Sequence, residues 1–181
     1  SEYEQELMRE KRVVVGRLDA RFTGPAGDSL ERGPSHDPQS SAISSAYTSA
    51  FNTYLRTDLG YDGEREYVPS GRARPWSWEH SSGGGVSFGF SATPNVGPDL
   101  ATAMIRNPNL EVLLIDGIYD LATPYFAAVW TMDNLNLPAE LRDNIQRADF
   151  EAGHMMYVEQ KLLPQWRNTL LAFIKRTSGD Q

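Results

Sequence analysis

The C-terminal half of the chain alternates short apolar runs with amphipathic stretches, and this order constrains the fold more than any other feature. Residues 110–116 (LEVLLID) form a short apolar run of the kind found in buried parallel strands. A second strand is expected at 145–151, and helices are expected at 98–106, 124–135 and 164–176. Strand, helix, strand, helix predicts a parallel sheet with covering helices, so the expected fold class is α/β.

The N-terminal half has a different pattern. Residues 2–12 predict a charged helix with a thin apolar stripe, and residues 13–15 predict a strand end or a linker. The segment 23–40 is rich in Gly and Pro and predicts a loop. Apolar residues recur at helical spacing over 41–59, which predicts one clear amphipathic helix, whereas 61–97 is irregular.

Length and composition limit the domain organisation and the classes of function. A chain of 181 residues can hold one domain or one and part of another, and we divide it into 1–97 and 98–181. A net charge of −7 opposes binding to DNA or RNA, and no apolar run approaches the roughly 18 residues of a membrane span. The absence of cysteine excludes disulfides and a cysteine nucleophile. The three histidines are scattered without metal-ligand spacing, so we expect neither a metal nor a cofactor.

Two polar residues follow the two predicted strands. Asp120 lies four residues beyond Asp116, and His154 comes just after the second strand. Catalytic groups of open α/β sheets gather at the carboxyl ends of strands, and Asp followed by His is the order of the α/β-hydrolase triad. In such a triad the carboxylate orients an imidazole that takes a proton from a serine. The spacing alone leaves open that Asp120 is a turn residue before a helix capped by Thr123, and that His154 is structural.

Both loops resemble those of a known family. Residues 116–124 (DGIYDLATP) resemble the aspartate loop of the serine carboxypeptidase family, and residues 151–157 (EAGHMMY) resemble its histidine loop, where Gly-His-Met is the hallmark. Further segments are similar to the bacterial branch: 15–22 (VGRLDARF), 107–110 (NPNL) and 172–174 (AFI). The resemblance covers most of the chain, and the two loops are its most specific part.

The resemblance implies the C-terminal portion of an α/β-hydrolase that releases C-terminal residues from peptide substrates. It implies that Asp120 and His154 are two members of a Ser-Asp-His triad, and that Met155 lines the pocket for the last residue of the substrate. It also implies that the region from about 13 to 97 includes part of a helical cap over the active site. A periplasmic or secreted location is suggested by the resemblance alone.

The family's nucleophile stands in a Gly-Glu-Ser-Tyr-Gly motif, which this chain does not contain. We therefore expect the serine in the remaining N-terminal part of the enzyme, upstream of this chain, whether the chain is a truncation, a proteolytic piece or a second chain. Alone, the chain should be nearly inactive. Residues 85–89 (GVSFG) match the general G-x-S-x-G pattern, but they lack the apolar strand before and the helix after that such an elbow needs.

Two alternatives remain. An esterase-like hydrolase could use Ser87 of that glycine-rich segment as its nucleophile. A non-catalytic docking or structural fragment is the other, because half of an α/β sheet exposes a strand edge and an apolar face. Such a fragment should self-associate through the exposed sheet edge.

Overall fold

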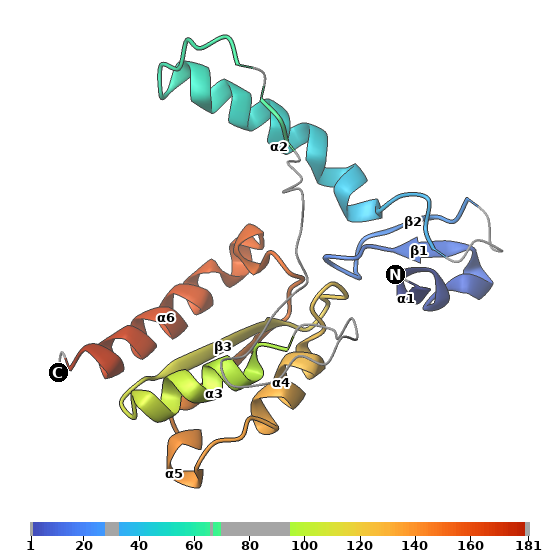
Figure 1. Cartoon of the computed structure of the whole chain (residues 1–181). Coiled ribbons are helices and arrows are strands. Elements are labelled where there is room, and N and C mark those ends of the chain that lie inside the picture. Colours follow the sequence, from blue (N-terminus) through green and yellow to red (C-terminus); the bar gives the residue numbers. More distant parts are fainter. Residues whose placement is uncertain (1, 28–32, 66, 70–94, 180–181) are drawn as a thin grey trace, which may run out of the picture. The chain divides into compact units, whose positions relative to one another are not determined.

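The structure, a computed structural model, describes residues 2–27, 33–65, 67–69 and 95–179 (Figure 1). The chain divides into two compact units, Ser1–Trp76 and Ser77–Gln181. Among the described residues, each unit holds a two-stranded sheet of its own. Residues 70–94 of the expected irregular region 61–97, including Ser87 and its glycine-rich surroundings, lie outside the described residues.

The second unit contains the parallel strands. β3 (Val112–Gly117) runs parallel to β4 (Ile145–Phe150), with Val112 opposite Ile145 and Gly117 opposite Phe150. Both strands lie within two residues of the ranges predicted from their apolar runs. The expected α/β class is thereby confirmed as a mixture of helix and sheet with a small parallel sheet.

Helices precede, connect and follow these strands. They are α3 (Gly97–Arg106), α4 (Tyr125–Asp133), α5 (Ala139–Arg142) and α6 (Leu163–Ser178), with short 3₁₀ turns η2 (Met156–Val158) and η3 (Gln160–Leu162) before α6. The predicted helices at 98–106, 124–135 and 164–176 correspond to α3, α4 and α6, and a proline lies in the first turn of α3 and of α6.

The helices lie on both faces of this sheet. Successive side chains of a strand point to opposite faces, so neighbouring positions of β3 and β4 contact different helices. Val112 and Ile145 pack against the cluster that contains α3. Arg176 of α6 forms an ion pair with Glu111 and lies against Gln146. Figure 1 accordingly shows the strands running between α6 and α3.

A small core fixes the starts of both strands. Its buried members are Ala101, Met104, Leu135 and Leu137, and the partly buried side chains against them are Leu100, Val112, Met132, Leu141 and Ile145. Ala101 and Met104 lie one turn apart, so a single face of α3 supplies both. Burying each large side chain contributes about 1.5–3 kcal/mol. This cluster therefore holds the register that brings the carboxyl ends of β3 and β4 side by side.

The first unit departs from the prediction at its start. α1 (Glu2–Glu6) and the 3₁₀ turn η1 (Arg9–Lys11) replace the single helix expected over 2–12. The chain turns at Arg12, whose φ of 53° is left-handed, and enters β1. Tyr3 and Leu7, the two residues of the thin apolar stripe, are both exposed.

β1 (Val13–Val15) pairs with β2 (Thr23–Pro25) in antiparallel fashion, so the first residues of the expected 23–40 loop form a strand instead. The turn between them closes at Gly16, whose N–H donates to Phe22 O over 2.8 Å. A Cβ on Gly16 would lie 2.5 Å from the backbone oxygen of Asp19. The turn that brings β2 beside β1 therefore requires glycine at position 16.

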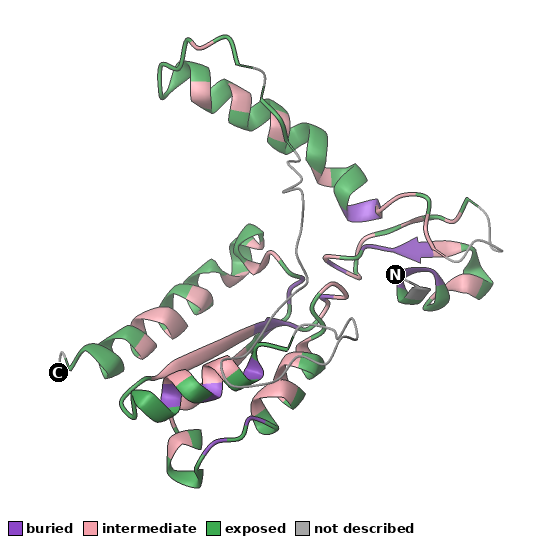
Figure 2. Ribbon diagram, in the orientation of Figure 1, coloured by how far each residue is buried: buried purple, intermediate pink, exposed green. Residues whose placement is uncertain are grey.

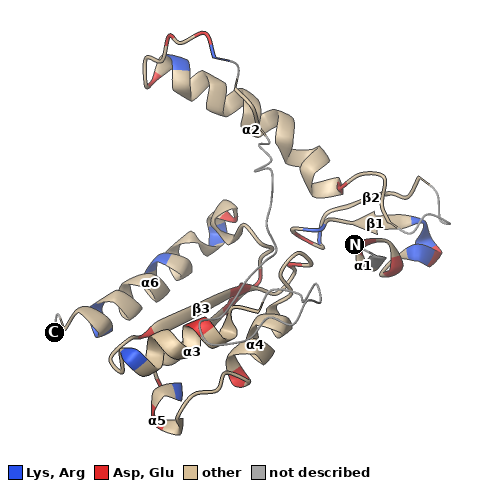
Figure 3. Ribbon diagram, viewed as in Figure 1, with Lys and Arg blue, Asp and Glu red and all other residues tan. Residues whose placement is uncertain are grey.

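The helix expected over 41–59 is confirmed as α2 (Pro38–Thr57). It begins earlier than predicted because Asp37 caps it, accepting the N–H of Ser40 on Oδ1 at 3.0 Å. Figure 2 shows the helix exposed along most of its length, and Figure 3 shows that it is nearly free of charged residues. No helix among the described residues is both long enough and apolar enough to cross a membrane.

Candidate active site

The two candidate residues stand on loops that the backbone fastens together. The loop after β3 carries Asp120, and the loop after β4 carries His154. Backbone hydrogen bonds continue beyond the two strands. The N–H of Ile118 donates to the carbonyl of Phe150, and the N–H of Tyr119 donates to the carbonyl of Ala152, each at a distance of 3.0 Å. The first part of each loop therefore has a defined position relative to the other.

Gly117 allows this close approach. A Cβ at this position would lie 2.2 Å from the carbonyl oxygen of Gly153 and 2.7 Å from that of Ala152. Both atoms belong to the backbone, which cannot yield as a flexible side chain would. A glycine at the end of β3 is therefore a condition for the histidine loop to lie where it does.

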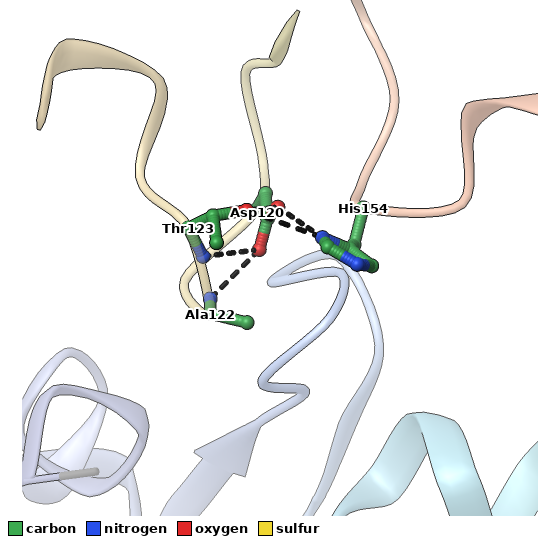
Figure 4. A network of polar contacts seen from close by, with 4 residues as sticks. All are labelled: Asp120, Ala122, Thr123 and His154. Carbon is green, nitrogen blue, oxygen red and sulfur yellow. Dashed lines mark hydrogen bonds and ion pairs between the residues drawn. The ribbon is translucent and has the colours of Figure 1, made fainter. Parts of the chain in front are cut away.

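Asp120 and His154 form a hydrogen-bonded pair. His154 Nδ1 lies 2.7 Å from Asp120 Oδ2, and the two side chains point toward each other (Figure 4). The expectation that they meet at one edge of the sheet is confirmed. The aspartate side chain is only 4% exposed, whereas that of the histidine is 46% exposed. Among the described residues, the other ring nitrogen, Nε2, has no hydrogen-bond partner.

The Asp120 carboxylate receives three further hydrogen bonds from its own loop. Oδ1 accepts the N–H groups of Ala122 at 2.7 Å and Thr123 at 3.0 Å, and Oδ2 accepts the Thr123 hydroxyl at 2.6 Å. This is the local turn that a short acidic side chain makes with the backbone two and three residues ahead.

These contacts decide the charge of Asp120. Burial raises the pKa of its carboxyl group, but the hydrogen bonds from Thr123, His154 and Ala122 together outweigh burial and lower the pKa below its ordinary value. Asp120 is therefore ionised at neutral pH and remains so into the acidic range. An ionised carboxylate only accepts hydrogen bonds, so the Nδ1 that faces it carries a proton.

The expected capping role of Thr123 is wrong. Pro124 occupies the cap position before α4, and no side chain makes a cap hydrogen bond there. The Thr123 hydroxyl is instead directed at Asp120 and also lies 3.2 Å from His154 Nδ1. Sequence reasoning missed this contact, although Asp and Thr three residues apart is a spacing that such turns use.

A second carboxylate, Asp116, is buried at the end of β3. It is 8% exposed, and its Oδ2 has no hydrogen-bond partner among the described residues. Burial is the main cause that raises the pKa of Asp116, and the charge of Asp149, opposite it on β4, raises it further. Arg147 lowers the pKa and Asp120 raises it by smaller amounts.

The remaining candidates have fewer contacts. Met155 follows His154 directly and is half-buried at the start of η2, and its substrate-binding role stays a prediction. Ser87 lies outside the described residues. In the part of the chain that the structure describes, no three His, Cys, Asp or Glu side chains gather in a way that could hold a metal ion.

Comparisons with known protein families, curated proteins and solved structures found no match for this chain. The resemblance of the two loops to serine carboxypeptidases therefore rests on the residues themselves.

Proposed function

We propose that this chain is the C-terminal portion of a serine carboxypeptidase-like α/β-hydrolase and supplies the Asp and His of its catalytic triad. The observation that carries the proposal is the 2.7 Å contact between Asp120 Oδ2 and His154 Nδ1, made by loops that follow neighbouring parallel strands. The amino-acid sequences of both loops, with Gly-His-Met after the second strand, support the same enzyme class.

Each residue has a defined part in the proposed reaction. A serine hydroxyl from the upstream part of the enzyme attacks the last peptide carbonyl of the substrate, and His154 Nε2 takes its proton. The imidazolium then gives this proton to the departing amine, and water releases the acyl group by the same steps. Asp120 holds Nδ1–H and stabilises the imidazolium. Met155 lines the pocket for the residue that leaves.

The burial of Asp120 and the exposure of His154 support these two roles. The buried, ionised Asp120 is shielded from solvent, so its attraction for an imidazolium is stronger than in water. The partly exposed ring of His154 can present Nε2 to a group from another part of the protein. Within the described residues β3 pairs only with β4, so a sheet edge is available for the remaining N-terminal part of the enzyme.

The test is hydrolysis of N-blocked dipeptides. We expect the 181-residue chain alone to be nearly inactive, and we expect the polypeptide encoded together with its upstream sequence to release the C-terminal residue. In that longer protein, Asp120→Asn should lower kcat by about 10⁴-fold, because the amide favours the wrong imidazole tautomer. Full activity of the Asp120→Asn protein would refute the proposal. Turnover by the chain alone that Ser87→Ala abolishes would favour the esterase alternative.

A second candidate, a non-catalytic docking fragment, is favoured by exposed apolar side chains. Phe126 and Trp130 of α4 are 65% and 60% exposed, although large aromatic residues usually pack. They lie four residues apart and thus share one face of the helix. A fragment of this kind would self-associate and would remain without peptidase activity in the longer protein.

A further inference from the structure

Three polar atoms form a closed triangle between the two loops (Figure 4). Thr123 Oγ1 lies 2.6 Å from Asp120 Oδ2 and 3.2 Å from His154 Nδ1, and that nitrogen lies 2.7 Å from the same carboxylate oxygen. The hydroxyl therefore contacts both members of the pair, although it comes from the same loop as the aspartate.

The protons of this triangle can be assigned from the donor inventory. Asp120 is ionised and can only accept, so the single hydroxyl proton of Thr123 goes to Oδ2. The lone pairs of Oγ1 are then left for Nδ1. An unprotonated Nδ1 would face two electron-rich oxygens without a proton between them. The arrangement is consistent only with Nδ1–H, which leaves Nε2 of the neutral ring as an acceptor.

The Thr123 hydroxyl does not cap the following helix. α4 begins at Tyr125 with Pro124 before it, and it makes no side-chain cap hydrogen bond. Without the Thr123 hydroxyl, Oδ2 would keep only the histidine as partner, and rotation of the carboxylate would be less restricted.

We propose that Thr123 is a positioning residue, whose hydroxyl holds the Asp120 carboxylate in place and thereby strengthens the preference of His154 for the Nδ1–H tautomer that this carboxylate sets. The catalytic consequence rests on the proposed function, because only a general base needs an unprotonated Nε2. The tautomer itself does not depend on that function and can be measured without substrate or serine.

The experiment is ¹⁵N NMR of histidine-labelled 181-residue protein at a pH above about 8, where an ordinary imidazole is neutral. The His154 signals are assigned by their loss in His154→Gln. Wild-type protein should show mainly Nδ1–H. Thr123→Val, which keeps the shape and removes the hydroxyl, should lower the ratio of Nδ1–H to Nε2–H severalfold. The upper bound is about tenfold, which corresponds to the full energy of about 1.5 kcal/mol for a hydrogen bond to a charged group. Thr123→Ser should restore the wild-type ratio.

Thr131→Val is the matched control, because the Thr131 hydroxyl donates to Ala127 O within α4 and does not contact the pair. If Thr123→Val does not fold, as judged by circular dichroism, Thr123→Ala replaces it in the same comparison with Thr123→Ser. An unchanged tautomer ratio in the folded variant would overturn the proposal, and so would a Thr123→Ser protein that behaves like Thr123→Val.

The two proposals fail separately. If the peptidase proposal is wrong, the longer protein lacks activity while the Thr123 variants still change the tautomer. If the positioning proposal is wrong, Thr123→Val leaves the tautomer unchanged while Asp120→Asn still lowers kcat strongly. In an active longer protein, Thr123→Val should lower kcat and leave KM unchanged, because the hydroxyl does not bind substrate.

Discussion

Asp116 and Asp120 are two buried carboxylates only four residues apart, and their surroundings shift their pKa values in opposite directions. Asp120 accepts hydrogen bonds on both oxygens, which outweigh its burial. Asp116 has an Oδ2 without a partner among the described residues and faces the carboxylate of Asp149. Donors within hydrogen-bond reach, rather than burial, thus decide which of the two is more acidic.

This difference predicts opposite contributions to stability as the pH changes. Because the pKa of Asp116 is raised on folding, the folded state holds that proton more tightly, and stability falls as the pH rises from the unfolded pKa through the folded one. Asp116→Asn should therefore stabilise the protein by about 1 kcal/mol at neutral pH and have little effect in acid. Urea unfolding at both pH values measures this.

The matched control is Asp143→Asn, an exposed carboxylate after α5, which should change the free energy of unfolding little at either pH. An equal gain from Asp116→Asn at acidic and neutral pH would contradict the assignment.

For Asp120 the pH dependence of stability has the opposite sign. Its lowered pKa adds stability above the unfolded pKa, and this stability is lost as the pH falls through the folded value.

At the same scale, the sequence predicts the pair of Asp120 and His154 but not the Thr123 hydroxyl that contacts both. The order of Asp120 and His154 after successive strands can be read from the sequence, and it predicted their contact. The role of Thr123 was not visible, because Thr before Pro is compatible with a helix cap and with a turn around the preceding aspartate. Only the direction of the hydroxyl distinguishes the two.

At the scale of elements, the ends of β3 and β4 determine the site through close backbone packing. Apolar runs and the Pro98 and Pro164 helix starts predicted the elements of the second unit well, because their local signals agree with their packing. The start of the chain was predicted poorly. The α-helix ends at Glu6, and the chain continues through η1 to Arg12, whose left-handed conformation leads into β1. This entry into the strand is a tertiary requirement without a local signal.

Gly117→Ala should destabilise the protein by about 1–3 kcal/mol, because the added methyl would meet the carbonyls of Ala152 and Gly153. It should also separate the loops and so reduce the Nδ1–H signal of His154. Thermal unfolding and the same NMR measurement check both effects. Gly33→Ala is the control, since an added Cβ there meets nothing within 4 Å. Equal stability of the two variants would show that the loops do not depend on this contact.

At the scale of the whole molecule, the exposed apolar residues have a consequence in solution. The aromatic face of α4 and the unpaired edges of the described two-stranded parallel sheet are the kinds of surface that associate. Both proposals for function need such a surface, one for the rest of the enzyme and the other for a partner. Sequence predicted the edge from the number of strands, but exposure of α4 depends on what packs against it.

We expect the purified chain to elute above its monomer mass of 20.2 kDa, with a mass that rises with concentration. Trp130→Lys should lower the mass toward the monomer by placing a charge on the aromatic face of α4. Leu59→Lys, at an exposed apolar residue of the first unit, should not. Light scattering after size exclusion measures this, and a wild-type monomer at every concentration would contradict it.

The loop around Asp120 has a consequence for the order in which the site assembles. Three of its four hydrogen bonds join residues no more than three positions apart, whereas the bond to His154 spans 34 positions. Contacts between near neighbours cost little chain entropy and close within a fraction of the time that distant ones need. We therefore expect the local hydrogen bonds around the carboxylate to form before the one to the imidazole, which requires β4 to dock beside β3.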